Sequence, residues 1–129
     1  MRRSLFRVVA GLAVYGALML VLVLAVFRPV AGVVPPSEPP VHPLFAFAVY
    51  VVLAVLLFEW TVRRMVSPWR AAFVLGAAQF ILVNVDMVLR GDRAFTTAAA
   101  STLVLAVTWA GLALFYLIMN RRISRSDGK

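Results

Sequence analysis

The chain has 129 residues, of which 64% are hydrophobic and only 14% are charged, a composition that excludes an ordinary water-soluble domain. Its 13 Lys and Arg residues against 5 Asp and Glu give a formal net charge of +8. These charges lie in short clusters between long apolar runs, an arrangement that argues against a nucleic-acid-binding face. Cysteine is absent, which excludes disulfides, thiolate metal sites and thiol catalysis.

Four apolar runs follow one another along the chain, at residues 8–27, 44–62, 71–89 and 98–119. Each is close to the ~20 residues that a helix needs to cross the hydrocarbon core of a bilayer. Because the runs are continuously apolar and do not alternate, they favour helices over the strands of a membrane barrel. The sequence therefore predicts a single all-α domain, a polytopic membrane protein built as an antiparallel bundle of four transmembrane helices.

The positive charges predict how this bundle is threaded, since Arg and Lys are retained on the cytoplasmic side of short loops. Apart from Arg28, Arg90 and Arg93, every Arg and Lys lies near an end of the chain or in the 63–70 connection. We therefore expect both termini and this connection in the cytoplasm. The small size and the Arg-rich, Lys-poor composition favour a bacterial inner membrane as the location. A cleaved signal peptide is the alternative for the first run, which is longer than the usual ~7 to 15 residues of a signal core.

The connections carry turn-forming residues. Residues 28–43 hold every proline except Pro68, which excludes helix and predicts a stiff, extended, non-cytoplasmic loop, with a proline-rich docking motif as the alternative. The 90–93 connection reads Arg-Gly-Asp-Arg, which a tight turn with Gly91 at positive φ explains without an adhesion function. Residues 120–129 are expected to form a short cytoplasmic tail.

Two acids fall inside the predicted spans, each near a span's end and each followed four residues later by an arginine. This acid-first spacing predicts the ion pairs Glu59 with Arg63 and Asp86 with Arg90. Proton or ion handling is the alternative, because an ionisable group inside the membrane is a functional candidate. The two acids lie toward opposite faces of the membrane and cannot form one carboxylate pair.

Uncharged polar residues mark the third and fourth spans. Gln79 and Asp86 share one side of the third helix, Ser101 and Thr108 share one side of the fourth, and Asn84 points elsewhere. Since an amide in hydrocarbon needs a partner, we expect a contact between Gln79 and Thr108, which lie at similar depth. These five residues form a candidate intramembrane polar site.

No nucleophile and base pair, metal-ligand set or phosphate-binding glycine loop is evident, and His42 is the single histidine. We therefore expect no catalytic residue, no metal and no cofactor. The favoured function is an accessory or interaction subunit of a membrane complex. The alternative is a small dimeric transporter or channel for an ion or small solute. The expected partners are the lipid bilayer and another membrane protein or a second copy, without nucleic acid.

Overall fold

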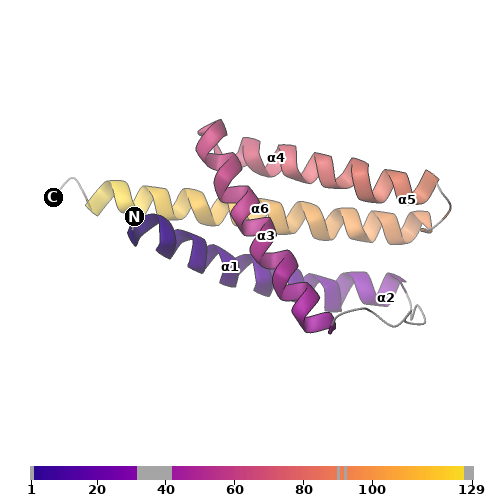
Figure 1. Cartoon of the computed structure of the whole chain (residues 1–129). Coiled ribbons are helices and arrows are strands. Elements are labelled where there is room, and N and C mark those ends of the chain that lie inside the picture. The colour runs from indigo at the N-terminus through magenta and orange to yellow at the C-terminus, as the bar shows by residue number, and fades with distance from the viewer. Residues whose placement is uncertain (1, 32–41, 90, 92, 127–129) are drawn as a thin grey trace.

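The computed structural model describes residues 2–31, 42–89, 91 and 93–126 (Figure 1). No strand occurs in these residues. Four of their helical stretches are long and apolar enough to cross a membrane, namely Leu5–Ala31, Pro43–Met65, Pro68–Leu89 and Phe95–Arg122. The predicted all-α fold with four candidate membrane spans is confirmed.

The first and third spans are each interrupted by a π-helical turn, which the sequence pattern did not indicate. The first span consists of α1 (Arg2–Leu22), the π-helical turn η1 (Val23–Phe27) and α2 (Arg28–Ala31). The third consists of α4 (Pro68–Gln79), the π-helical turn η2 (Phe80–Val85) and α5 (Asp86–Leu89). The second and fourth spans are unbroken, and they are α3 (Pro43–Met65) and α6 (Phe95–Ser126).

Pro29 lies inside helical backbone, which corrects the expectation that the 28–43 connection excludes helix. A proline ring normally clashes with the carbonyl four residues earlier, here that of Ala25. Ala25 belongs to η1, and we attribute the relief of this clash to the wider π-helical turn. Helix therefore continues as far as Ala31, and the part of the expected loop at 32–41 lies outside the described residues.

The fourth span also runs past its expected end at residue 119, because α6 continues to Ser126. The predicted polar tail is thus helical over its described part. Arg121 and Arg122 are exposed near the helix end, where positive charge interacts favourably with the helix dipole. Residues 127–129 lie outside the described part of the chain.

Local signals set the other helix ends. At the start of α3, His42 Nδ1 accepts a hydrogen bond from the Leu44 amide at 3.3 Å, and Pro43 occupies a first-turn position where no amide hydrogen is needed. Val66 ends α3 with a left-handed φ of 64°, and Pro68 opens α4. Gly91 has a φ of 79°, as the tight-turn interpretation predicts.

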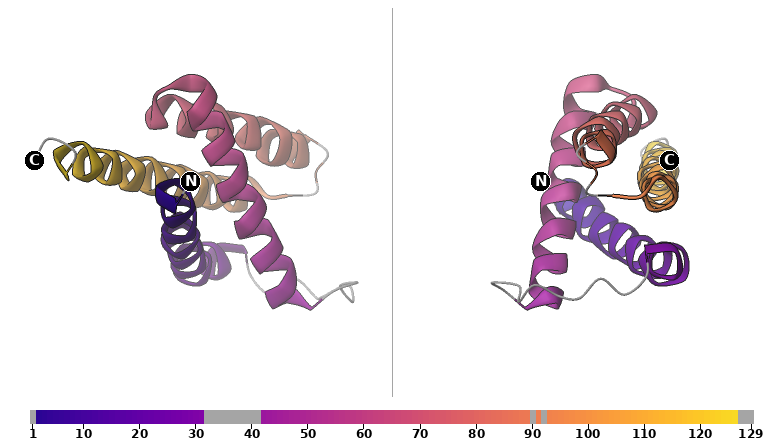
Figure 2. Two further views of the ribbon diagram at one scale, coloured as in Figure 1. Left: turned by 60° about the vertical axis from the view of Figure 1, so that its left-hand side comes forward. Right: turned by 90° about the vertical axis from the view of Figure 1, so that its right-hand side faces the viewer.

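The four spans form a ring in which α1 and α4 each pack against both α3 and α6 (Figures 1 and 2). α3 crosses the others obliquely and diverges at its start, where residues 42–46 are exposed. The start of α1, the end of α6 and the α3–α4 turn lie at one end of the bundle, which we call the near end. The end of α5 at Leu89 and the start of α6 at Phe95 mark the opposite or far end.

The apolar core lies toward the near end, where α3 joins the other three spans. Gly111 allows α1 and α6 to approach closely, since a Cβ there would stand 2.5 Å from Leu18 Cδ1. The core is formed by Tyr15, Val51, Ala54, Val55, Phe58, Val62, Ala71, Ala72, Leu105, Trp109, Leu112, Ala113 and Tyr116.

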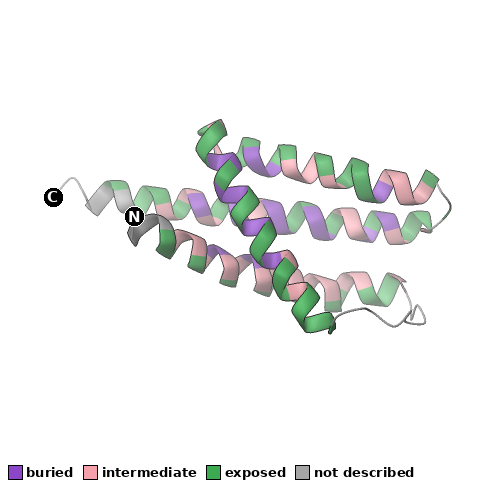
Figure 3. Cartoon of the chain, in the orientation of Figure 1, coloured by how far each residue is buried: buried purple, intermediate pink, exposed green. Residues whose placement is uncertain are grey.

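The outer faces of the helices carry large exposed apolar side chains (Figure 3). Phe73 on α4, for example, is 76% exposed, and Leu5, Leu82 and Phe95 are exposed to a similar degree. Such a surface is unfavourable in water and is what a lipid environment requires.

Candidate functional site

Polar side chains gather in three clusters along the bundle: one at the near end, one in the middle and one toward the far end. Each cluster joins residues from different spans. The near-end cluster contains Arg7, Glu59, Arg63, Tyr116 and Asn120, the central one Tyr15, Tyr50, Gln79 and Trp109, and the far one Asn84, Arg93 and Thr102.

Glu59 is the centre of the near-end cluster and is only 4% exposed. Arg7 of α1 donates hydrogen bonds to both oxygens of the Glu59 carboxylate, from Nε to Oε2 at 3.2 Å and from Nη2 to Oε1 at 2.6 Å. Arg63, one turn further along α3, donates from Nε to Oε1 at 3.0 Å. Paired contacts of this kind are the stronger form of ion pair, and they compensate the cost of burying the carboxylate.

Arg7 also reaches α6. Its Nη1 donates to Asn120 Oδ1 at 3.0 Å, and its guanidinium carbon lies 5.1 Å from the centre of the Tyr116 ring. One arginine near the start of the chain therefore ties α1 to both α3 and α6. The Tyr116 hydroxyl is buried in the same cluster and has no hydrogen-bond partner among the described residues.

The central cluster is a chain of hydrogen bonds across all four spans. Trp109 Nε1 donates to Gln79 Oε1 at 3.0 Å, and Gln79 Nε2 donates to the Tyr50 hydroxyl at 2.8 Å. The Tyr50 and Tyr15 hydroxyl oxygens lie 3.2 Å apart and share a hydrogen bond. The Tyr15 and Trp109 rings are also in contact, with centroids 5.2 Å apart. The Gln79 amide is thus bonded at both its oxygen and its nitrogen.

The expected contact between Gln79 and Thr108 is not among the bonds of the described residues. Thr108 donates to carbonyls of its own helix, Val104 O at 2.8 Å and Leu105 O at 3.0 Å. The neighbouring residue Trp109 supplies the donor to Gln79 instead. The Trp109 indole and the two tyrosine hydroxyls were not among the predicted site residues, and the partners of Gln79 were therefore missed.

The far cluster is centred on Asn84 in η2, which is 1% exposed. Asn84 Nδ2 donates to Thr102 Oγ1 at 3.0 Å, and Asn84 Oδ1 accepts from Arg93 Nη1 at 2.7 Å. The Arg93 guanidinium lies 5.8 Å from the centre of the Phe27 ring, and Phe27 belongs to η1. Arg93 thereby connects the two π-helical turns.

The five residues of the predicted intramembrane site do not form one cluster. Gln79 belongs to the central chain and Asn84 to the far cluster, while Thr108 is bonded within its own helix. Asp86 in α5 and Ser101 in α6 are half-buried. The proposed partner of Asp86, Arg90, lies outside the described residues. Arg7, the further partner of Glu59, was missed because 52 positions separate the two residues.

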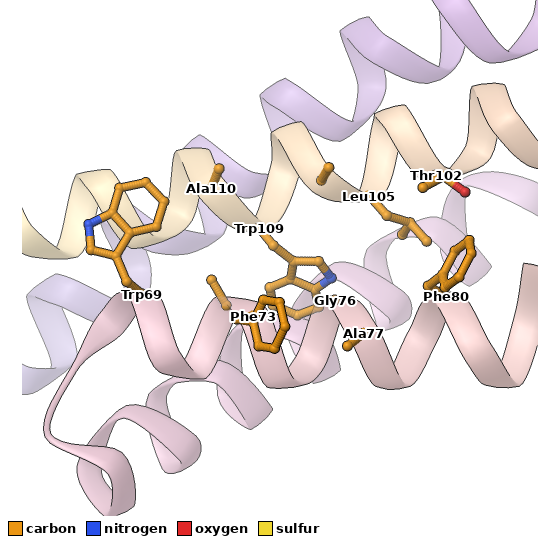
Figure 4. A pocket seen from close by; sticks show the side chains of 11 residues that line it. Trp69, Phe73, Gly76, Ala77, Phe80, Thr102, Leu105, Trp109 and Ala110 are labelled. Carbon is orange, nitrogen blue, oxygen red and sulfur yellow. The ribbon is translucent and has the colours of Figure 1, made fainter.

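Apolar grooves run along the outside of α4. The groove between α4 and α6 has a volume of about 350 Å³ (Figure 4). The side chains of Trp69, Phe73, Trp109 and Phe80 border it, and Gly76 forms part of its floor. A second groove of about 340 Å³ lies between α3 and α4. Neither groove contains a charged side chain.

Within the described ranges, no three His, Cys, Asp or Glu side chains are grouped so that they could hold a metal ion. The four apolar spans with exposed apolar outer faces indicate a multi-pass membrane protein. Comparison of the chain with protein-family models, with curated proteins and with solved structures finds no match.

Proposed function

We propose that the protein is a non-enzymatic interaction subunit of a membrane complex, a preformed four-helix body that packs against a larger membrane protein. The observation that carries this proposal is that the polar side chains inside the bundle already have hydrogen-bond partners within the chain. Gln79 and Asn84, the two amides of the central and far clusters, are bonded to side chains of the same chain, while the grooves outside are apolar.

A solute pathway requires a different arrangement. Polar and ionisable groups along such a path face a water-filled cavity near the middle of the membrane. Here the mid-bundle polar groups are bonded to one another across the ring. Tyr50 and Gln79 also line the α3–α4 groove, but their polar atoms are engaged in these bonds, and the rest of that groove is aliphatic or aromatic. This bonding supports a structural role for the central chain.

The first span offers a surface for a partner helix. Only 11% of its most apolar part is buried within the chain, as in the third span, against 39% in the second and fourth spans. Ala13 and Ala17 are exposed one turn apart on the outer face of α1. Small residues at this spacing permit close approach of another membrane helix. The partner expected here is therefore an apolar transmembrane helix of another membrane protein.

The orientation belongs to this proposal too. We propose that the near end, which holds Arg7, Arg64, Arg70 and the arginines of the α6 end, faces the cytoplasm of a bacterial cell. The positive-inside rule supports this choice.

The test is purification of the full chain in mild detergent, with stoichiometric partners identified by mass spectrometry. Ala13→Leu with Ala17→Leu should lower the recovery of a partner at least several-fold. Ala48→Leu, an equally exposed position on α3, serves as the matched control and should leave recovery unchanged. Recovery that is unchanged in the α1 variant contradicts the proposed surface.

A small dimeric transporter remains the second proposal, and the two π-helical turns favour it. π-helical turns are rare in proteins, and those that occur are often found at functional sites. Here the two turns are linked through Arg93, which bonds to the buried Asn84. Vesicles with the purified protein that dissipate a proton or solute gradient, with loss of activity in Asp86→Asn, would favour this function over an interaction subunit.

A further inference from the structure

We propose that the protein binds an anionic phospholipid at the α3–α4 turn, with the phosphate between Arg64 and Arg70 and one acyl chain along the α4–α6 groove. The proposal goes beyond the role of an interaction subunit. It rests on a basic hollow at the near end, an apolar groove along the membrane-spanning direction, and two aromatic residues that border both.

The basic hollow has a volume of about 570 Å³ and is lined by Arg64 and Arg70 together with Met65, Trp69, Phe73 and Val74. Both arginines are exposed, and neither forms an ion pair with a described residue. Their neighbour Arg63, in contrast, contacts the buried carboxylate of Glu59. Two positive charges of this turn are thus available to an anion from outside the chain.

Two exposed tryptophans place this hollow at the level of lipid headgroups. Trp60 and Trp69 lie on either side of the turn and are 58% and 48% exposed, and tryptophan is enriched at this depth of the membrane. The Arg64 guanidinium lies 5.5 Å from the centre of the Trp60 ring, a contact that holds the arginine beside the hollow.

The hollow adjoins the α4–α6 groove at Trp69 and Phe73, which line both. From Trp69 to Phe80 the groove extends along α4 for about 16 Å at the usual ~1.5 Å per residue. One leaflet of the hydrocarbon core is about 15 Å thick, half of the ~30 Å total. An acyl chain whose headgroup sits at Arg64 and Arg70 therefore has a groove of matching length and polarity (Figure 4).

The two parts together select the ligand. A free phosphate would contact two exposed arginines in water, where such pairs contribute little, and would leave the groove unused. A zwitterionic lipid brings its own positive group to a basic hollow. An anionic phospholipid satisfies both parts, and each arginine near an anionic surface raises the association constant by about a factor of five.

The test uses the full-length protein reconstituted in phosphatidylcholine vesicles that contain a minority of phosphatidylglycerol. Either lipid is supplied with brominated acyl chains, which quench nearby tryptophan fluorescence. Trp69 and Trp109 border the groove, so in a protein with Trp60→Phe, which removes the third tryptophan, the quenching reports its occupancy. We expect a preference for brominated phosphatidylglycerol of about tenfold, somewhat below the product of the two arginine contributions. Equal quenching by the two lipids overturns the proposal.

Variants separate the two parts of the site. Arg64→Gln with Arg70→Gln should reduce the preference nearly to parity, while Arg121→Gln with Arg122→Gln, exposed arginines at the same end, should leave it unchanged. A preference that persists in the Arg64 and Arg70 variant contradicts the proposal. Circular dichroism and gel filtration of each variant verify that the fold is retained.

Filling the groove tests the acyl-chain part. Ala106 is exposed and lines the groove, so Ala106→Phe should lower the quenching by brominated phosphatidylglycerol, whereas Ala48→Phe on α3 should not. Equal effects of the two variants would overturn the placement of the chain. Inorganic phosphate at matched ionic strength should not displace the lipid, and displacement would assign the arginines to a soluble anion instead.

Discussion

The near and far ends of the bundle are held together by different interactions. At the near end α3 crosses the other spans and completes an apolar core that contains fully buried Val55, Phe58 and Leu112, with the Glu59 cluster beside it. Toward the far end α3 diverges, both π-helical turns occur, and Asn84 and Arg93 form the main cross-links. The comparison indicates a firmly packed near end and a far end held mainly by side-chain hydrogen bonds.

The largest effect is expected at the near end, from Glu59→Gln. The variant leaves the Arg7 guanidinium beside a neutral amide in a mostly buried position, and breaking a buried ion pair in this way costs about 3 kcal/mol of unfolding free energy. Unfolding in mixed micelles measures it. Arg63→Gln is the control, since the Arg63 side chain is 58% exposed and its contribution should stay below about 1 kcal/mol. Equal losses of unfolding free energy in the two variants would contradict a larger contribution from the buried Arg7–Glu59 pair than from the exposed Arg63–Glu59 pair.

The central chain should give the next largest effect. Gln79→Leu removes the partner of the Trp109 indole and one of the two partners of the Tyr50 hydroxyl, and hydrogen bonds between membrane helices contribute about 0.6 kcal/mol on average. We expect a loss of about 1 to 2 kcal/mol in the same unfolding measurement. Tyr15→Phe removes the bond between the Tyr15 and Tyr50 hydroxyls and should give a smaller loss. A loss in Tyr15→Phe that exceeds that of Gln79→Leu would contradict the bonding pattern.

The far end should respond locally. Arg93→Gln removes the link between Asn84 and the Phe27 ring, so amide hydrogen exchange in η2 and α5 should accelerate while exchange in the second half of α3 stays unchanged. The global loss should be about 1 kcal/mol. Arg28 is an exposed arginine near the same end, so Arg28→Gln serves as the control and should leave the exchange rates in η2 and α5 unchanged. Acceleration throughout the bundle would show that the two ends are not independent.

The smallest effect is expected from Thr108→Val. The Thr108 hydroxyl donates to two carbonyls of its own helix, and valine has nearly the same shape. The unfolding free energy should change by no more than about 0.5 kcal/mol. A loss of unfolding free energy as large as that of Gln79→Leu would support the contact between Gln79 and Thr108 that the sequence predicted.

The sequence predicted the parts of this structure that depend on local pattern. Apolar run length predicted four spans, and turn chemistry predicted the positive φ of Gly91. The partners of polar groups depend on tertiary packing instead. The contacts of Glu59 with Arg7 and of Gln79 with Tyr50 and Trp109 join residues far apart in the chain, and helical periodicity carries no information about them. The π-helical turns had no recognised signal, although Pro29 lies two residues after the end of η1.

Four membrane crossings would leave both ends of the chain on the same side of the membrane. Because the chain has no cysteine, single variants Ser4→Cys, Ser37→Cys, Ser67→Cys and Ser126→Cys can be labelled with a membrane-impermeant maleimide in intact and permeabilised cells. We expect Ser37→Cys to react from outside, and the other three to react only after permeabilisation. Reaction of Ser4→Cys and Ser126→Cys from opposite sides would contradict the four crossings.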